Sequence, residues 1–308
     1  MKNVLVATDK PFAKEAVDKI RAIVEAAGFK LSLLEKYTQK SELIDAVKSA
    51  NAVIVRSDIM SKDVIEAGSE LKIVVRAGAG YDNLDLEACT ANGVVAMNTP
   101  GQNANAVAEL VFGMMILNAR KGYSGASGSE LRGKKIGIHA YGNVGQYVAK
   151  IAKGFGMEVY AFDPFVADDK VKADGVTPLK TVEELYSTCH FVSLHIPATE
   201  KTKKSINYAL LNKMPKGGVL VNTARKEVID EAELVQLMEE RKDFSYLSDI
   251  IPDNAAVYAE KFAGRYFFTP KKMGAQTDEA NVNAGVAAAN QIVNFFTKGD
   301  ETFRVNKK

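Results

Sequence analysis

The sequence predicts an α/β protein built from two doubly wound parallel-sheet domains. Short runs rich in Val, Ile and Leu alternate along the 308 residues with longer stretches whose apolar residues recur at helical spacing. This alternation is typical of parallel strands that are joined by crossover helices. It stops at a Pro-Gly turn at residues 100–101 and starts again near residue 135, so we expect two such sheets.

The first series of strands is separated by amphipathic stretches such as residues 14–27, which place their apolar side chains on one helical face. After the Pro-Gly turn we expect a long apolar helix at about residues 103–119 and then a small-residue segment, GYSGASGSE, at residues 122–130. The strands expected before the turn are residues 4–7, 30–34, 52–55, 72–75 and 94–97.

The second series begins with a strand, a glycine turn and a helix from residue 135 onward. The last helix, at about residues 279–298, has too many apolar residues to stand alone, so we expect it to pack on a sheet. The strands expected in this half are residues 136–139, 158–162, 191–195, 218–222, 246–250 and 266–268.

Composition places the chain among ordinary globular proteins, with 47% hydrophobic and 25% charged residues. No apolar run approaches the roughly 18–20 residues of a membrane span, and the N-terminus lacks the regions of a signal peptide. The net charge of +2 is spread along the chain, so we expect no nucleic-acid or membrane partner. Two cysteines, Cys89 and Cys189, cannot form a disulfide framework, which favours the cytoplasm, and we predict no metal site.

The glycine turn at residues 140–145, AYGNVG, lies between a strand and a helix. Backbone amides at a helix N-terminus attract a pyrophosphate, and glycine lets the backbone approach it closely. Ala140 stands where the usual motif has its first glycine, which is tolerable if its φ is negative. The pattern predicts a dinucleotide site at Tyr141, Gly142, Asn143, Val144 and Gly145.

Asp163 lies eighteen residues beyond Gly145, at the end of the next expected strand. A carboxylate in this position can accept a hydrogen bond from a ribose hydroxyl and would repel the 2′-phosphate of NADP. Asp163 therefore favours NAD. A turn of this kind, taken alone, could also be an ordinary turn or a flavin site.

Several separate motifs, in one order, resemble the D-2-hydroxyacid dehydrogenases, and most closely the D-3-phosphoglycerate dehydrogenases. The resemblance runs from about residue 50 to about residue 290. The matching stretches are VRS (55–57), VVRAGAGYDNLD (74–85), NTPGQNANAVAEL (98–110), VSLHIPAT (192–199), PKGGVLVNTARKEVIDEAEL (215–234) and TPKKMGAQTDEA (269–280).

The resemblance implies a split layout. A flavodoxin-like substrate domain would contain residues 1–98 and 279–308, with an NAD-binding Rossmann domain, residues 99–278, inserted into it. It also implies a homodimer formed largely through the helix at residues 103–119. Because the sequence ends soon after the last helix, we expect a short form without the C-terminal regulatory domain of longer relatives.

The resemblance also implies roles for individual residues. Arg225 would bind the substrate carboxylate and keto oxygen, which suits a guanidinium; a solvated surface Arg is the alternative. The loop Ala77, Gly78, Ala79 and Gly80 would offer backbone amides to the same carboxylate, or be a plain turn. Asp249 would hold the nicotinamide carboxamide. On the cofactor side the resemblance adds His195, which would line the cofactor cleft, and Thr223.

The pair Arg56 and Ser57 resembles the phosphate-contacting element of the phosphoglycerate dehydrogenases. A guanidinium with a neighbouring hydroxyl is suitable phosphate chemistry. A structural salt bridge is the competing role for Arg56.

The sequence departs from the family at the acid–base position. Most relatives carry a histidine in T-P-His-x-Gly, whereas this segment reads TPKKMG (269–274). In those relatives the histidine is oriented by a glutamate five residues after the aspartate that corresponds to Asp249. Here that position is Asn254. Counting from Pro270 puts Lys271 in the histidine's place, and counting back from Gly274 puts Lys272 there. A lysine can accept the hydroxyl proton if a nearby cation and partial burial lower its pKa. The alternative is that both lysines only attract phosphate or carboxylate.

The resemblance therefore implies NAD-dependent oxidation of 3-phospho-D-glycerate to 3-phosphohydroxypyruvate, the first step of serine biosynthesis, with Lys272 or Lys271 as the base. One alternative is a glyoxylate or hydroxypyruvate reductase, or another D-2-hydroxyacid dehydrogenase, which would not need the phosphate element. A second alternative is an NAD-binding module similar to the C-terminal-binding-protein corepressors, but it would leave Arg56 and Ser57 unexplained.

Overall fold

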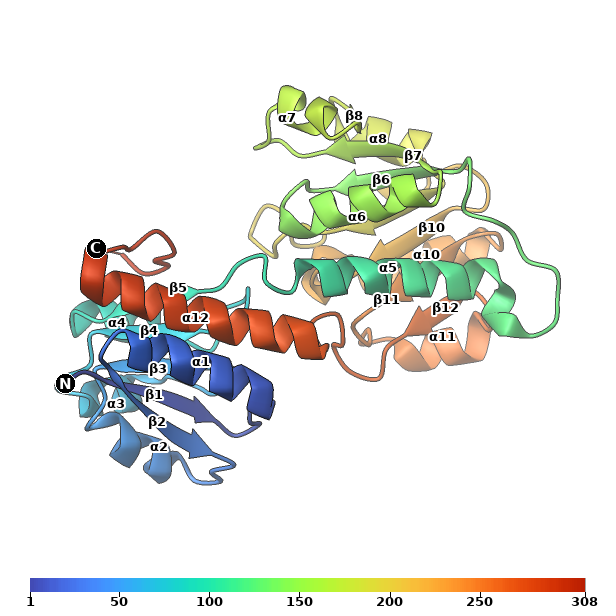
Figure 1. The fold of residues 1–308 in the computed structure, drawn as a ribbon. Coiled ribbons are helices and arrows are strands. Elements are labelled where there is room, and N and C mark those ends of the chain that lie inside the picture. The colour runs from blue at the N-terminus through green and yellow to red at the C-terminus, as the bar shows by residue number, and fades with distance from the viewer. Residues whose placement is uncertain (308) are drawn as a thin grey trace. The chain divides into compact units, whose positions relative to one another are not determined.

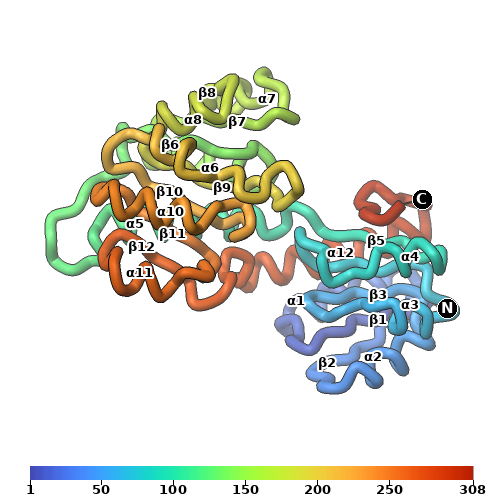
Figure 2. The backbone as a smooth tube through the Cα atoms, turned by 180° about the vertical axis from the view of Figure 1, so that it is seen from behind, coloured from blue at the N-terminus to red at the C-terminus, as the bar shows by residue number. Residues whose placement is uncertain are grey.

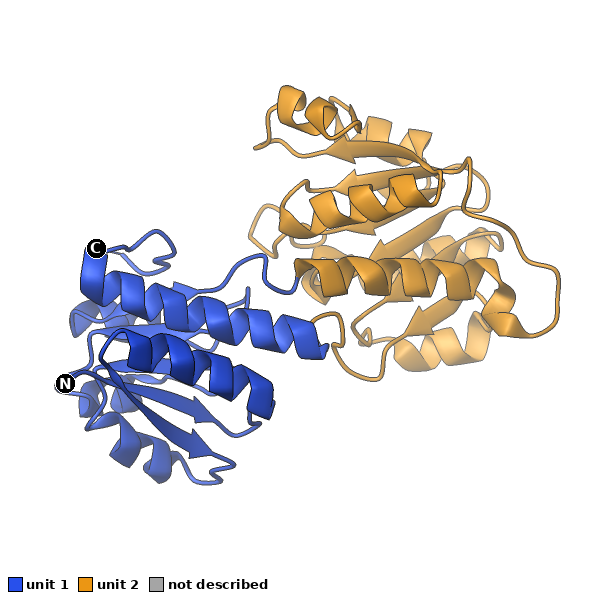
Figure 3. Cartoon of the chain, viewed as in Figure 1, with its two compact units in different colours: residues 1–103, 276–308 blue, residues 104–275 orange. Residues whose placement is uncertain are grey.

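The computed structural model describes residues 1–307. The chain divides into two compact units, of which unit 1 contains Met1–Asn103 and Gln276–Lys308 and unit 2 contains Ala104–Ala275 (Figure 3). Each unit contains one sheet whose paired strands are all parallel. The predicted class, an α/β protein with two doubly wound parallel sheets, is confirmed.

The sheet of unit 1 has the strand order β2-β1-β3-β4-β5, which is the flavodoxin-like order. The inner strands are almost fully buried, whereas the edge strand β2 exposes half of its residues. The strands are β1 (Asn3–Thr8), β2 (Lys30–Glu35), β3 (Ala52–Val55), β4 (Ile73–Arg76) and β5 (Val95–Asn98).

Helices cover both faces of this sheet (Figures 1 and 2). Because side chains alternate along a strand, Val4 and Val6 pack with α1 and α12, whereas Leu5 and Ala7 pack with the helices of the opposite face. The helices are α1 (Lys14–Ala26), α2 (Lys40–Val47), α3 (Lys62–Ala67), α4 (Leu86–Ala91) and α12 (Asp278–Lys298).

The C-terminal part of the chain returns to unit 1. Helix α12 packs beside α1, as Figure 1 shows, and its buried Gln291 donates from Nε2 to the carbonyl oxygen of Asn98 at 3.0 Å. Beyond the helix, Asn306 accepts from the N–H of Ala96 at 2.9 Å and donates to the carbonyl of Val94 at 3.0 Å. The last helix thus buries its apolar face against the first sheet, as its composition predicts.

The sheet of unit 2 has the strand order β12-β11-β10-β9-β6-β7-β8. Strands β6 and β9 are neighbours at the middle of the sheet. β7 and β8 follow on the β6 side, and β10, β11 and β12 follow on the β9 side. This is the Rossmann arrangement, and the strand order reverses between β6 and β9. The strands are β6 (Lys135–His139), β7 (Glu158–Phe162), β8 (Thr177–Pro178), β9 (Phe191–Leu194), β10 (Val219–Asn222), β11 (Ser245–Ser248) and β12 (Tyr266–Phe268).

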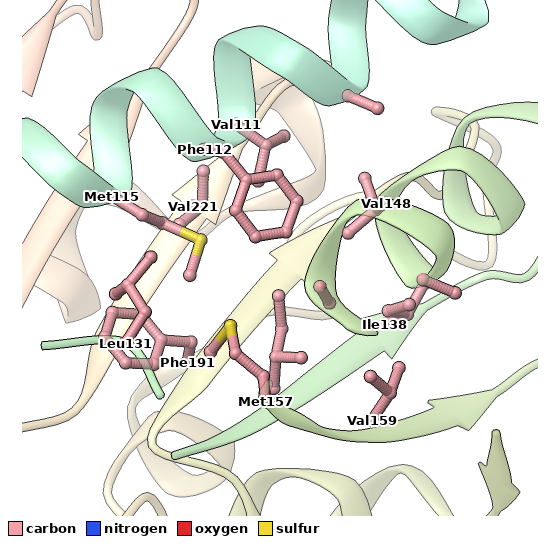
Figure 4. Packing of buried hydrophobic residues seen from close by; sticks show 14 of the residues in the cluster. Val111, Phe112, Met115, Leu131, Ile138, Val148, Met157, Val159, Phe191 and Val221 are labelled. Atoms are coloured by element: carbon pink, nitrogen blue, oxygen red, sulfur yellow. The ribbon is translucent and has the colours of Figure 1, made fainter. Parts of the chain in front are cut away.

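One core of unit 2 lies between its sheet and the helices α5 and α6. Figure 4 shows Val111 and Phe112 of α5 directed toward Val148 of α6 and Ile138 of β6. The ring of Phe112 also stacks on Phe155 at 5.1 Å between centroids. The helices are α5 (Ala104–Ala119), α6 (Asn143–Gly154), α7 (Asp168–Ala173), α8 (Val182–Thr188), α9 (Tyr208–Leu211), α10 (Glu231–Glu240) and α11 (Ala255–Lys261), with short 3-10 turns at Lys121–Tyr123 and Lys226–Val228.

The predicted strand positions agree with the structure to within one residue at most ends, and the largest shift is at β11. The sequence interpretation missed β8, because its two residues end in a proline and provide no periodicity. The predicted site residues lie directly after the strands of their own unit, at the carboxyl ends, where ligands bind in open parallel sheets.

Candidate active site

The glycine turn of unit 2 is suited to a pyrophosphate. Helix α6 starts at Asn143, with Gly142 as its N-cap, so the first amides of the helix have no acceptor within it. Gly142 and Asn143 are exposed, and a Cβ placed on Gly142 would meet no atom within 4 Å. The amides of the turn are therefore open to a ligand, and the half-positive helix end favours an anion there.

Gly145 lies where helix α6 crosses strand β6. A Cβ on Gly145 would lie 2.4 Å from the carbonyl oxygen of Ala140 and 3.0 Å from Cγ2 of Ile138. Only glycine fits such a contact, so Gly145 allows helix α6 and strand β6 to approach closely.

Ala140 does not have the negative φ that would make it a comfortable replacement for glycine. Its φ is +83°, in the left-handed region that a Cβ disfavours. The expectation was wrong because the turn must bring the chain sharply from β6 into α6, whichever residue occupies the position. The turn therefore carries backbone strain beside the cofactor amides.

Asp163 directly follows β7 and accepts hydrogen bonds that fix the glycine turn at residues 140–145. Its Oδ2 accepts from the backbone N–H of Tyr141 at 2.8 Å, and its Oδ1 accepts from that of Phe165 at 2.8 Å. The Tyr141 side chain is fully buried, and its hydroxyl donates to Asp174 at 3.0 Å. Tyr141 can therefore offer a ligand only its main chain, and its amide is already used by Asp163.

His195 follows β9 and is held between two hydroxyl groups. Its Nε2 lies 2.9 Å from Ser193 Oγ and its Nδ1 lies 3.4 Å from Thr223 Oγ1. Burial and the neighbouring imidazole of His139 lower the pKa of His195 to about 3, so its ring is neutral at physiological pH. His139 lies in β6 and is also buried.

Arg225 and Lys272 meet at one backbone oxygen. Lys272 donates from Nζ to the carbonyl of Ala224 at 2.9 Å, and Arg225 Nη1 lies 3.4 Å from the same oxygen. Asn222 fixes this turn, since its side chain accepts from the Ala224 N–H at 2.9 Å and donates to the Arg225 carbonyl at 3.2 Å. Two cations from segments nearly fifty residues apart are thus brought to one place.

Asp249 fixes the segment that carries Lys272. This carboxylate is 1% exposed, and its Oδ1 accepts from Thr269 Oγ1 at 2.9 Å and from the Met273 N–H at 2.7 Å. Its Oδ2 accepts from the Gly274 N–H at 2.8 Å. Both ends of the segment 269–274 are therefore tied to one buried charge, a role that the sequence interpretation missed because the donors are mostly backbone groups.

The two candidate lysines differ in their surroundings. Both are exposed, so the partial burial expected for the base is not found in unit 2. Lys271 has no hydrogen bond or ion pair within the described chain, whereas Lys272 is directed to the turn that holds Arg225. Asn254, at the position of the missing glutamate, is the N-cap residue of α11.

Arg56 of unit 1 is engaged in neutral hydrogen bonds rather than in a salt bridge. Its Nη1 donates to the carbonyls of Lys10 and Pro11 at 3.0 and 3.2 Å, and its Nη2 donates to Asn281 Oδ1 of α12 at 2.6 Å. The guanidinium also lies over the ring of Phe12, 5.2 Å from its centroid. The side chain thus has a structural role; within the described chain it forms no ion pair, although Asp58 and Asp9 lie near enough to attract its charge.

The loop after β4 has fewer available amides than the sequence suggests. The N–H of Ala77 donates to Val55 and that of Gly78 donates to Arg76, so the amides of Ala79 and Gly80 are the two without an acceptor in the described chain. Ser57, after β3, is exposed.

Arg76 is a further candidate that the sequence interpretation missed, although it lies inside the quoted VVRAGAG motif. A Cβ on Gly78 would lie 1.4 Å from Arg76 Nη1, so the guanidinium lies directly against this glycine. Its Nε donates to the Arg56 carbonyl at 3.0 Å. Two arginines thus approach the same end of the sheet of unit 1.

Comparison with known proteins identifies the family. Residues 103–266 match the family model described as "D-isomer specific 2-hydroxyacid dehydrogenase, NAD binding domain". The chain is 32% identical over 304 residues to the hydroxypyruvate reductase of Thermotoga maritima, which covers 93% of this chain and 96% of that protein. The chain belongs to the D-isomer-specific 2-hydroxyacid dehydrogenases. It is therefore an oxidoreductase, and its NAD-binding domain contains the glycine turn described above.

Relatives named for phosphoglycerate are also similar to this dehydrogenase. A crystal structure of NAD⁺-bound 3-phosphoglycerate dehydrogenase from Entamoeba histolytica has 48% sequence identity and a TM-score of 0.88, and 99% of each chain is covered. The D-3-phosphoglycerate dehydrogenase of Methanocaldococcus jannaschii is 34% identical over 272 residues, which is 82% of this chain but 51% of that protein. The chain thus spans about half the length of that curated relative.

The residues present fit NAD. The open amides of the turn suit the pyrophosphate, and the Asp163 carboxylate lies against the same turn. Within residues 1–307 there is no group of three or more His, Cys, Asp or Glu that could hold a metal ion. In that same part of the chain, no helix is both long and apolar enough to cross a bilayer.

Proposed function

We propose that this dehydrogenase oxidises 3-phospho-D-glycerate to 3-phosphohydroxypyruvate with NAD⁺, the entry step to serine, and that Lys272 is the acid–base residue. The observation that carries the proposal is the shared contact of Lys272 and Arg225 with the carbonyl of Ala224. It supports Lys272 over Lys271, and it supplies the neighbouring cation that favours a neutral amine. The similarity to the Entamoeba enzyme supports the substrate.

The roles follow from charge. Arg225 binds the substrate carboxylate and stabilises the negative charge that develops on the C2 oxygen. The amine of Lys272 accepts the C2 hydroxyl proton, while NAD⁺ accepts the hydride from C2. Thr223 and His195 lie beside the same turn, where a neutral imidazole adds no charge near the cofactor. In this proposal Asp249 contacts the nicotinamide carboxamide as well as fixing the loop.

Unit 1 supplies the phosphate recognition in this proposal. Arg56, whose hydrogen bonds are all to neutral acceptors, and the exposed Ser57 are the proposed phosphate contacts. The amides of Ala79 and Gly80 are the proposed carboxylate contacts, while Ala77 and Gly78 shape the loop.

Reduction of hydroxypyruvate is the second candidate, because the Thermotoga hydroxypyruvate reductase matches this chain over nearly the whole length of both. Steady-state rates with 3-phosphoglycerate and with D-glycerate separate the two functions. We expect kcat/KM to favour the phosphorylated acid by about ten- to a hundredfold, since a lost charge-assisted contact to phosphate is worth roughly 1.5–3 kcal/mol. A preference for D-glycerate would contradict the proposed substrate.

The lysine assignment is tested by Lys272→Ala, with Lys271→Ala as the matched control one residue away. Loss of a general base lowers kcat by roughly 10²–10⁴-fold, whereas Lys271→Ala should keep most of the activity. Lys272→Arg should fail as well, because a guanidinium stays protonated. Full activity of Lys272→Ala would overturn the assignment, and absence of turnover of any hydroxy acid by the wild type would overturn the enzyme function.

We further propose that the protein is a homodimer that associates through α5. Leu117 of this helix is a partly exposed apolar side chain outside the core cluster of unit 2, whereas Leu110 and Ile116 pack against that cluster. Leu117→Glu should shift the mass measured by sedimentation from that of two chains to that of one. The proposed compartment is the cytoplasm, because Cys89 and Cys189 are both buried free thiols.

A further inference from the structure

A hollow of about 460 Å³ lies in unit 2 away from the residues used above. Its walls include Lys134, His190 and Gly217, which precede strands β6, β9 and β10, and Ser245, the first residue of β11. The end of α5 and the segment 121–129 complete it. The hollow thus lies at the amino ends of the strands, whereas the glycine turn follows the carboxyl end of β6.

The walls of this hollow carry three lysines, Lys121, Lys134 and Lys216. Within residues 1–307 none of the three forms an ion pair. Lys134 is half-buried, and its Nζ is held at the wall, 3.0 Å from Ser129 Oγ and 5.9 Å from the centre of the Phe191 ring. An ammonium whose one hydrogen-bond partner is a neutral hydroxyl leaves its charge available to an anion.

One carboxylate lines the hollow, but its charge is already compensated. Asp243 accepts from Arg241 Nη2 at 2.7 Å and from the Gly217 N–H at 2.7 Å. The hydrogen bond from Arg241 lowers the pKa of Asp243 to about 2, so the group stays ionised and paired. The C-terminal end of α5 also faces this region with its half-negative dipole, although the Ala119 carbonyl accepts from Ser129 N–H at 2.8 Å. The balance of charge at the walls remains positive.

Neutral polar groups complete the lining. The hydroxyls of Ser127 and Ser245 lie in the walls, and His190 Nδ1 is a buried ring nitrogen without a hydrogen-bond partner in the described chain. The hollow is therefore lined by cations together with neutral hydroxyl-bearing residues.

The segment that presents Lys121 is bent into an uncommon conformation. Lys121 and Tyr123 have φ values of +51° and +56°, and Gly122 between them has +63°. Left-handed backbone at side-chain-bearing residues is unfavourable, and such strain is concentrated at functional sites. The conformation turns the chain back from α5 across the amino edge of the sheet.

We propose that this hollow binds a compact multivalent anion, such as a small molecule with two phosphates or several carboxylates. Lysine ammonium groups act as point charges without the fork geometry of arginine, so the walls select for charge and size more than for phosphate over carboxylate. A volume of about 460 Å³ is in the range of sites for small molecules. Because NAD binding uses the opposite end of β6, both ligands can be bound at once.

Isothermal titration of the full chain with inorganic pyrophosphate, and separately with citrate, tests this site. We expect one site per chain with both probes and no binding of acetate or chloride at matched ionic strength. Lys134→Met and Lys216→Met should each weaken pyrophosphate binding about fivefold or more, whereas Lys213→Met, an exposed lysine outside the hollow, should leave it unchanged. Thermal unfolding of each variant shows that it is folded.

Saturating NAD should leave the pyrophosphate affinity unchanged. Three results would overturn the proposal: absence of binding by both probes, equal affinity in the Lys134→Met, Lys216→Met and wild-type proteins, and displacement of pyrophosphate by NAD. The last result would place the anion at the glycine turn instead. None of these readouts depends on the substrate or on the acid–base residue.

Discussion

The buried carboxylate of Asp249 accepts a hydrogen bond of 2.8 Å from the backbone N–H of Gly274. A Cβ on Gly274 would lie 2.9 Å from the same Oδ2 and 3.2 Å from Val107, so glycine at this position allows the contact. With the bonds from Thr269 and Met273, one charge holds the segment on both sides of Lys272. The position of the proposed base thus depends on an aspartate that lies in a different part of the sequence.

Asp249→Asn should loosen this segment. An asparagine amide has one acceptor oxygen, and its NH₂ group would face a backbone N–H donor. We therefore expect the free energy of unfolding to fall by about 2–3 kcal/mol. We also expect faster hydrogen exchange at the amides of Met273 and Gly274. Thr269→Val removes only the hydroxyl donor and should cost about 1 kcal/mol. Unchanged exchange in Asp249→Asn would contradict the role of the carboxylate.

Ala140→Gly should stabilise the protein. A φ of +83° costs an alanine about 1–3 kcal/mol, and the greater freedom of glycine in the unfolded chain offsets roughly 0.4–1 kcal/mol of the gain. Urea unfolding should show a net increase of about 0.5–1 kcal/mol. Ala149→Gly, the same change inside helix α6, should instead destabilise by at least about 1 kcal/mol. Destabilisation of equal size by both changes would show that strain at Ala140 is absent.

The buried His139 should make the protein sensitive to acid. Burial lowers the pKa of His139 to about 4, although Asp163 opposes the shift. The unfolded chain binds this proton below about pH 6.5, whereas the folded chain does so only near pH 4. Stability contributed by the neutral ring is therefore present above pH 6.5 and is lost as the pH falls toward 4.

Between pH 7 and pH 5 this residue should account for a loss of up to about 2 kcal/mol in the free energy of unfolding. Urea unfolding at the two pH values measures the difference, and His139→Asn should reduce it by that amount. An identical pH dependence in the variant would assign the acid sensitivity to other groups, of which His195 is the first to test.

Asp163→Ser should weaken the discrimination against NADP. The variant removes the charge that repels a 2′-phosphate but keeps an oxygen that can accept from the Tyr141 amide. We expect the ratio of kcat/KM for NADP to that for NAD to rise at least about tenfold. Asp174→Ser is the matched control, because Asp174 contacts the buried Tyr141 hydroxyl instead of the turn amide. A similar rise in the control would remove Asp163 as the selective group.

The elements of the fold could be predicted because the information is local. Each strand is a short apolar run, and each crossover helix shows its own period, so β1 to β5 could be placed without knowing their neighbours. The glycine turn was equally local, since its position between a strand and a helix can be read from neighbouring residues. The φ of Ala140 was predicted wrongly, because residue type says little about a turn whose course is set by the elements on both sides.

The surroundings of the site residues could not be predicted, because they are made by residues distant in sequence. Arg56 is held by Asn281, 225 positions away, and a sequence pattern gives no indication of such a pairing. Counting from either side left Lys271 and Lys272 equivalent, and only the contact with Ala224 distinguishes them. The loop at residues 77–80 could be located, but which of its amides are already used depends on β3.

The return of helix α12 to unit 1 has a consequence for synthesis on the ribosome. Unit 2 is continuous in sequence, so it can fold as soon as residue 275 has emerged. The five strands of unit 1 are synthesised first, but unit 1 cannot complete its folding at that stage. The sheet face that α12 covers stays exposed until residue 298 is available. Val6, Ile54 and Val75 lie on that face, so the nascent chain carries an uncovered apolar surface through most of translation and becomes a substrate for chaperones that bind such surfaces.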